Sequence, residues 1–378
     1  MKKLLLLISC MILLLTGTVT AQPEKAEAGI DSIMKELNVA GLSVAVVKNH
    51  KIIYTHSFGY QNKEENKPLS DEGLFRIASI SKSFSATSIM QLVEQHRISL
   101  DDDVSNLIGF RVRHPNFPDR VITLRMLLSH RSSLNDSQGY FNLDVLDPST
   151  NPDWAKCYNN YGPGERYQYC NLNFNMAGTI IERISGERFD QYVKHHVLDP
   201  LKIYGGYCVD SLDKSRFVTI YEYKADSNIF VASPGAYAPR SEEIKNYRLG
   251  RTTPIFSPTG GMKITATGLA TYMIMHSRLG KYKGGRIISK RSAREMQAPL
   301  SVEEGYGMAI TNVDKLIPGI KMRGHTGGAY GLNSAMFWNP KKKYGFVVIS
   351  SGSKSIYKDG FPTILRSTVQ CLYNAFIK

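Results

Sequence analysis

The sequence predicts an α/β protein of the α+β type, with an antiparallel sheet flanked by terminal helices and an inserted, mainly helical region. Segments typical of strands lie near both ends of the chain, and helical patterns fill the middle. The simplest packing pairs the terminal strands in one sheet. We expect the sheet to come from about 22–75 and 300–378 and the helical region from about 80–300. A cleft between them is the default place for a ligand.

The amino-terminal part supplies a helix, a hairpin and a second helix. "AGIDSIMKELN" has helical apolar spacing, and "GLSVAVVKNHKIIYTHSFGYQN" reads as two strands around Asn49-His50. "SKSFSATSIMQLVEQHRI" reads as a helix that begins close to Ser79. Its apolar side is expected to carry Ile80, Phe84, Ile89 and Leu92.

The middle of the chain is expected to contain helices and long loops. Helical patterns occur in "TLRMLLSH", "NFNMAGTIIERISG", "ATGLATYMIMHSRL" and "SKRSAREMQ". Strands return in "GYGMAIT", "SAMFWNP" and "KYGFVVISSG", and a final helix is expected in "FPTILRSTVQCLYNAFIK". The long regions 136–160 and 205–255 are expected to line the cleft.

Residues 1–21 have the pattern of a secretory signal peptide. Lys2 and Lys3 precede the apolar run "LLLLISCMILLL", and "TVTA" ends at Ala21. We therefore expect an exported protein, periplasmic or secreted, with a mature domain over 22–378 and no membrane span after cleavage. The alternatives are a retained anchor and a lipoprotein attached at Cys10.

Net charge and cysteine content exclude only a few classes of function. The 378 residues carry a net charge of +14, spread along the chain, with no zinc-finger spacing and no arginine-rich arm. Nucleic acid is therefore not an expected partner, although the charge could favour anionic substrates. The four cysteines beyond the signal allow three complete disulfide pairings, or they are free thiols: Cys157, Cys170, Cys208 and Cys371.

The pair Ser79 and Lys82 in "FRIASISKSFSA" is the first candidate for catalysis. A serine hydroxyl needs a base within hydrogen-bond reach, and residues three apart share one face of a helix. The amino terminus of that helix would also direct unpaired N–H groups at developing negative charge. Alone, the segment is equally compatible with the start of an ordinary amphipathic helix.

Two further segments strengthen this hypothesis. "GPGERYQYCN" contains Tyr169 and Asn171, two apart on an expected extended loop, and a tyrosine near two cations would lose its proton more easily. "GHTGGAYG" precedes a strand, and its glycines would let a backbone approach a substrate, where an N–H could complete an oxyanion hole with that of Ser79. Alone, these segments could be a core tyrosine and a plain turn.

Together, the ordered Ser-x-x-Lys, Tyr-x-Asn and His-Thr-Gly-Gly segments resemble the serine β-lactamase and penicillin-binding-protein superfamily, closest to its class C-like branch. The resemblance covers roughly residues 27–376. "ITLRMLLSHRSSL" resembles the segment that usually ends in His-Thr-Ser-Gly-Leu, and "SPTGGMKITATGLATYM" resembles the Gly-Gly stretch before a helix. The resemblance implies a β-lactamase/transpeptidase-like fold and neither a metal nor an organic cofactor.

The resemblance also implies a role for each site residue. Ser79 is the acylated nucleophile, Lys82 assists its deprotonation, and Tyr169 transfers protons to the leaving group and from water. The substrate-binding residues are Asn171, His325, Thr326 and Gly327, and the N–H groups of Ser79 and Gly328 form the oxyanion hole.

Three positions depart from the family pattern. His325 stands where lysine often holds a substrate carboxylate, which favours an esterase, amidase or peptidase over a β-lactamase. Cys170 replaces the usual serine, and a Cys157–Cys170 bridge would stiffen its loop. Ser133 replaces a glycine, and His130 is expected to be structural.

The expected activity is hydrolysis of an ester or amide in a small-molecule, peptide or peptidoglycan-derived substrate through an acyl-enzyme. The alternatives are a β-lactamase, a D-alanyl-D-alanine carboxypeptidase, an acyltransferase, or a catalytically silent protein that binds peptidoglycan or a peptide.

Overall fold

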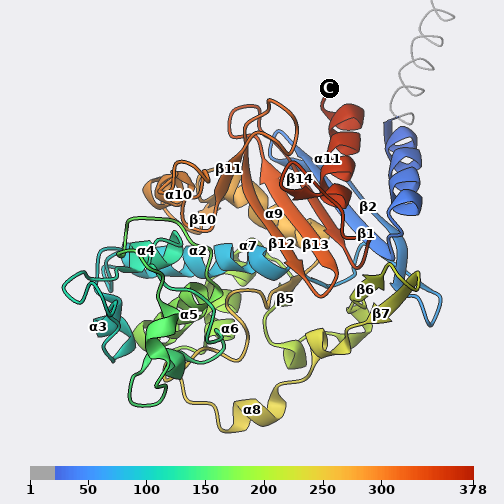
Figure 1. Ribbon diagram of the computed structural model, residues 1–378. Coiled ribbons are helices and arrows are strands. Elements are labelled where there is room, and N and C mark those ends of the chain that lie inside the picture. The colour runs from blue at the N-terminus through green and yellow to red at the C-terminus, as the bar shows by residue number, and fades with distance from the viewer. Residues whose placement is uncertain (1–21) are drawn as a thin grey trace, which may run out of the picture.

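The computed structural model describes residues 22–378 (Figure 1). The predicted signal peptide lies outside the described residues. Residues 22–36 form a helix, and none of the helices in 22–378 combines the length and the apolarity needed to span a bilayer.

The main sheet has seven strands in the order β11-β12-β13-β14-β1-β2-β3, and its neighbouring strands are antiparallel. Strands from the two ends of the chain meet where β1 pairs with β14, from Leu42 opposite Ser350 to Lys48 opposite Tyr344. This confirms the predicted fold class. The strands are β1 Gly41–Lys48, β2 Lys51–Asn62, β3 Lys67–Pro68, β11 Thr311–Val313, β12 Met322–Ala329, β13 Leu332–Trp338 and β14 Tyr344–Ser350.

Both faces of the sheet are covered by helices, because its central strands are apolar on both sides. Val44 and Val46 of β1 pack in one cluster with α11 (Thr363–Phe376) and the helix over 22–36. Ala45 and Val47, on the opposite face, join the larger core that contains α9 (Ala266–Ser277). Figure 1 shows the two terminal helices on one side of the sheet and α9 on the other.

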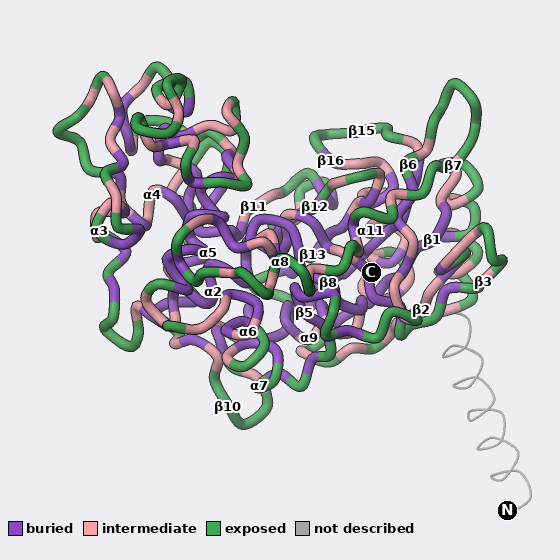
Figure 2. Tube along the Cα trace, turned by 90° about the horizontal axis from the view of Figure 1, so that it is seen from below, coloured by how far each residue is buried: buried purple, intermediate pink, exposed green. Residues whose placement is uncertain are grey.

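The helical region packs around α2 (Ser81–Glu94), which is buried on nearly every side (Figure 2). The sequence predicted that only one apolar side of this helix would be buried, and the buried surface is wider than that. Ser83, Ser85 and Thr87 are buried together with the apolar side chains. Their hydroxyl groups bond to Ile80 O, Pro258 O and the Tyr272 hydroxyl, which satisfies their polarity. The helix is thus a fixed central support for the residue that precedes it.

The remaining elements surround this core. The helices are α3 Val104–Ile108, α4 Leu124–Leu128, α5 Asn171–Ser185, α6 Phe189–Val193, α7 Asp199–Leu201, α8 Ser241–Lys245 and α10 Lys290–Gln297. The short strands are β4 Phe75–Arg76, β5 Gly205–Gly206, β6 Tyr221–Lys224, β7 Ile229–Ala232, β8 Lys263–Ile264, β9 Lys281–Tyr282, β10 Gly285–Arg286, β15 Tyr357–Lys358 and β16 Phe361–Pro362.

Two predicted elements show how turn chemistry decides local structure. Asn49 and His50 both have positive φ (52° and 61°), which suits a tight hairpin, and the predicted hairpin is confirmed. The strand predicted for "GYGMAIT" is mostly wrong, since only its last residue, Thr311, belongs to β11. Ala309 has a φ of 56°, which interrupts an extended chain.

Candidate active site

Ser79 lies in a 3₁₀ turn, η1 (Ala78–Ile80), immediately before α2 rather than inside it. Its side chain is partly exposed, and no side chain caps the start of α2. Ala78 has a φ of 45°, a left-handed conformation that costs a residue with a Cβ of order 1 kcal/mol. The turn thus carries backbone strain directly before the candidate nucleophile.

Lys82 points at Ser79 from the first turn of α2, as the sequence predicted. Its Nζ is 3.1 Å from Ser79 Oγ, 2.9 Å from Asn171 Oδ1 and 3.0 Å from Thr259 O. The residue has no exposed surface, and burial lowers the pKa of its amine to about 7. A neutral amine could donate to Asn171 and Thr259 and accept the Ser79 hydroxyl proton with its lone pair.

Asp136 connects Lys82 with the start of α5. Its two carboxylate oxygens accept hydrogen bonds from the backbone N–H groups of Asn171 (2.8 Å) and Leu172 (3.0 Å). Asn171 Nδ2 also donates to Asp136 at 2.9 Å, while Oδ1 of the same amide accepts from Lys82. The negative charge of Asp136 raises the pKa of Lys82 and so opposes the effect of burial.

Tyr169 covers Lys82 from the other side, with its ring centroid 4.8 Å from Nζ. It immediately precedes the N-cap residue of α5, and Asn171 is the first residue of that helix, so the two do not share an extended loop. Burial raises the pKa of Tyr169, and a hydrogen bond with Ser79 only partly offsets this. The expectation that nearby cations ease the loss of its proton was therefore wrong, and the phenol is neutral at pH 7.

The His-Thr-Gly-Gly segment belongs to strand β12 and passes directly against η1. A Cβ on Gly327 would lie 2.3 Å from Ile77 O and 3.0 Å from Ser79 N, so only glycine permits this approach. Gly328 follows on the same strand and is exposed. Strand β11 pairs only with Met322–Gly324, so within the described residues the β12 edge from 325 to 329 has no strand partner opposite β13.

His325 lies under the site as a buried, neutral side chain. Its Nε2 is 3.1 Å from the Tyr306 hydroxyl, and its Nδ1 bonds to Thr326 O. Burial lowers the pKa of His325 to about 4, so the ring carries no charge at pH 7. Thr326 is half-buried on the same strand. Position 325, where the resembled family often has lysine, therefore carries no positive charge at pH 7.

Two departures from the family pattern find a structural explanation. Ser133 adopts a φ of 66°, the conformation that glycine takes easily, and its hydroxyl bonds to Tyr161 O.

All four described cysteines are free thiols, so the possible Cys157–Cys170 bridge is absent. Cys170 is buried and donates to Asp136. His130 accepts a hydrogen bond from Cys170 N and packs beside the Tyr169 ring, which fits a structural role.

The structure thus brings Ser79, Lys82, Tyr169 and Asn171 together, with β12 alongside. Sequence reasoning missed Asp136 and Thr259. Asp136 lies two residues beyond the segment "ITLRMLLSHRSSL", and Thr259 lies inside "SPTGGMK". Asp136 could have been found, because it is an acidic residue next to a segment that resembles the family. Thr259 could not, because it contributes its backbone carbonyl oxygen, which nothing in the sequence marks. Residues 22–378 contain no cluster of three or more His, Cys, Asp or Glu side chains arranged to hold a metal.

Comparison with known proteins agrees with this geometry. A protein-family model described as Beta-lactamase matches residues 26–365. The chain belongs to the β-lactamase family. This confirms the resemblance to the serine β-lactamase and penicillin-binding-protein superfamily, and with it the assignment to a family of serine hydrolases.

Penicillin-binding protein 4* of Bacillus subtilis is 32% identical over 166 residues, which are 42% of this chain and 36% of that protein. The chain spans less than two thirds of the length of the first curated relatives that it matches. The octameric penicillin-binding protein homologue from Pyrococcus abyssi is 26% identical, with a TM-score of 0.72 over 93% of this chain and 77% of that one. EstCE1, a hydrolase with promiscuous acyltransferase activity, shares the fold at 21% identity, with a TM-score of 0.72 over 93% of this chain and 98% of that one.

Proposed function

We propose that the protein is an exported serine hydrolase of the class C β-lactamase-like type that cleaves an ester or amide through an acyl-enzyme on Ser79. One observation carries the proposal. Lys82 Nζ lies 3.1 Å from Ser79 Oγ, and burial lowers its pKa to about 7. A base poised near the operating pH and in contact with a serine hydroxyl is what nucleophilic catalysis requires.

In the acylation step, Ser79 Oγ attacks the substrate carbonyl carbon as neutral Lys82 takes the hydroxyl proton. The N–H groups of Ser79 and Gly328 stabilise the oxyanion. Tyr169, a neutral phenol beside Ser79, donates a proton to the leaving group and is restored by the protonated Lys82. In deacylation the same groups act in reverse order, and water takes the place of the leaving group.

The substrate carbonyl or amide lies along β12 in this proposal. The unpaired edge from His325 to Ala329 offers backbone groups, and Thr326 and Gly327 line the approach. Asn171 retains a second Nδ2–H beyond the one that contacts Asp136. The neutral state of His325 favours an esterase, amidase or peptidase over a β-lactamase or a D-alanyl-D-alanine carboxypeptidase.

Acyl transfer is a second candidate, because the fold is shared with EstCE1, a hydrolase with promiscuous acyltransferase activity. Turnover of nitrophenyl esters, with and without an added alcohol or amine, separates the two reactions. Ser79→Ala should lose all turnover and keep the wild-type unfolding temperature. Full activity in a folded Ser79→Ala variant would reject the proposed nucleophile.

A further inference from the structure

A separate cavity lies near the candidate nucleophile, and three basic side chains contribute to its lining. It has a volume of about 460 Å³, and its walls include Arg76, Lys263, Arg240, Tyr330 and Phe256 but not the four residues of the candidate active site. Regions 136–160 and 205–255, which the sequence predicted to line the cleft, contribute most of the lining of this cavity, including Phe141, Tyr207 and Thr253.

Contacts of the Arg76 side chain link this cavity to the segments around the candidate active site. Arg76 lies three residues before Ser79, and its Nε donates to Gly260 O at 2.7 Å. A Cβ on Gly260 would lie 3.7 Å from an Arg76 nitrogen and 3.8 Å from the backbone of Ala78. Tyr330 follows the last residue of β12, and its ring lies 5.2 Å from the Arg76 guanidinium. A substrate lying along β12 therefore reaches this cavity at the end of the strand.

Two basic side chains stand opposite each other at the cavity wall. Arg76 of β4 pairs in register with Lys263 of β8, so the two project on the same side of that small sheet. Lys263 is only 5% exposed, and its Nζ has one hydrogen bond within the described residues, to Tyr207 O at 2.7 Å. An ammonium group has three donors, so two remain available. Burial and the neighbouring Arg76 lower the pKa of Lys263 to about 7.

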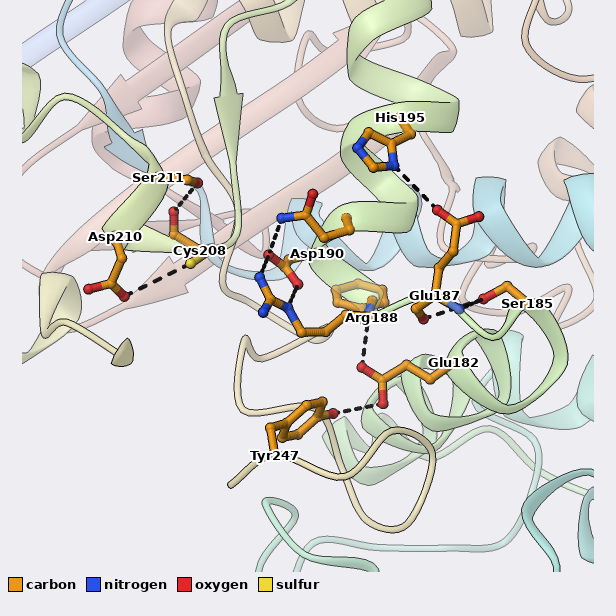
Figure 3. Close-up of polar contacts among 12 residues, drawn as sticks. Glu182, Ser185, Glu187, Arg188, Asp190, His195, Cys208, Asp210, Ser211 and Tyr247 are labelled. Carbon is orange, nitrogen blue, oxygen red and sulfur yellow. Dashed lines mark hydrogen bonds and ion pairs between the residues drawn. The ribbon is translucent and has the colours of Figure 1, made fainter. Parts of the chain in front are cut away.

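Two carboxylates near this cavity, Asp190 and Asp210, are already engaged in other contacts (Figure 3). Asp190 is close enough for its charge to raise the pKa of Lys263. Its two carboxylate oxygens, however, accept hydrogen bonds from Arg188 Nε at 2.6 Å and Arg188 Nη2 at 3.0 Å. Asp210 accepts from Arg240 N at 2.7 Å and is contacted by the Cys208 thiol. Arg240 itself pairs with Glu243. Arg76 and Lys263 thus have no carboxylate partner within residues 22–378, and a bound carboxylate would supply the counter-charge that favours the protonated form of Lys263.

We infer that this cavity is an anion subsite in which Arg76 and Lys263 bind a carboxylate carried by the substrate of Ser79. The inference rests on the proposed hydrolase function and specifies its substrate class as acidic esters or amides. A guanidinium group offers paired N–H donors to a carboxylate, and the two free N–H groups of Lys263 supply further hydrogen bonds. His325 is neutral, so the positive charge for such a group comes from this cavity instead.

The first test compares kcat/KM for matched esters. 4-Nitrophenyl hemisuccinate and 4-nitrophenyl butyrate differ in a carboxylate on the acyl side, and 4-acetoxybenzoate and phenyl acetate differ on the leaving-group side. The wild-type protein should prefer the acid in at least one pair. Arg76→Gln and Lys263→Gln should each reduce that preference by about 10- to 100-fold. Arg111→Gln removes the same charge from an exposed loop and should leave the preference unchanged.

The second test does not depend on turnover or on the folding of a subsite variant. Calorimetry on the full chain carrying Ser79→Ala should detect binding of monomethyl succinate and not of dimethyl succinate. No acid preference in either ester pair, together with equal or absent binding of the two succinates, would overturn the subsite. Failure of the proposed hydrolase function would be recognised independently, because a fluorophosphonate would then leave Ser79 of the wild-type protein unlabelled.

Discussion

Replacing Asp136 with asparagine tests how the site sets the basicity of Lys82. Asp136 is the acidic group whose charge most raises the pKa of Lys82, against the effect of burial. One amide group, that of Asn171, separates the carboxylate from the ammonium, with a 2.9 Å hydrogen bond on each side. Asparagine has nearly the same size but no charge, so the electrostatic contribution is removed with little change in packing.

The expected shift follows from Coulomb's law. At a separation of roughly 7 Å and an effective dielectric constant of about 20, two unit charges interact by about 2 kcal/mol. That energy corresponds to between about one and two pKa units. Because Asp136 favours the charged amine, its loss lowers the pKa of Lys82 from about 7. Neutral Lys82 is the proposed base, so the rise of kcat/KM with pH should move to lower pH by that amount.

The assay is the pH dependence of kcat/KM for an ester that Ser79→Ala does not hydrolyse. Asp119→Asn, which removes the same charge from an exposed loop, should leave the midpoint in place. Thermal unfolding monitors the cost of weakening the start of α5, where Asp136 accepts two backbone hydrogen bonds. A folded Asp136→Asn variant with the wild-type midpoint would refute the assignment of that midpoint to Lys82.

Three further predictions concern other parts of the structure. Lys82→Met should lower kcat by at least about 100-fold, because the proposed base is lost; activity near the wild-type level would exclude Lys82 as the base. His325→Gln should not move the midpoint of the pH profile between about pH 6 and 8, since His325 is already neutral there, and a shifted midpoint would show that this histidine titrates. Glu182→Ala removes the buried acceptor of hydrogen bonds from Phe189 N, Gly250 N and the Tyr247 hydroxyl, of which Figure 3 shows the bond from Tyr247. It should lower the free energy of unfolding by about 3 kcal/mol, measured by urea denaturation, whereas the half-buried Glu187→Ala should cost less.

The sequence was sufficient for the fold class because its strongest signals, apolar runs and turn residues, are local in the chain. Val44 and Val46 lie in an apolar run that has few alternatives to a buried strand, and Asn49-His50 marks the turn that follows it. The pairing of β1 with β14, more than 290 residues further along the chain, followed from packing the terminal strands in one sheet.

The environment of individual side chains was harder to predict from the sequence than the order of the helices and strands. Lys82 could be placed beside Ser79 by helical spacing, but its pKa depends on burial and on Asp136, which approaches from a loop 54 positions later. The same limit explains the error at Tyr169. Its neighbouring cation was foreseen, whereas the burial that dominates its pKa is a property of the assembled core.

The most direct test of the central claim is the intact mass of the protein after incubation with a fluorophosphonate. The Ser79→Ala variant and separate incubations with a penicillin and a cephalosporin serve as comparisons. We predict one fluorophosphonate adduct per chain, located on Ser79 by peptide mapping and absent from the variant, without a persistent β-lactam adduct. An unmodified wild-type protein, or an adduct that survives in Ser79→Ala, would contradict the acyl-enzyme account.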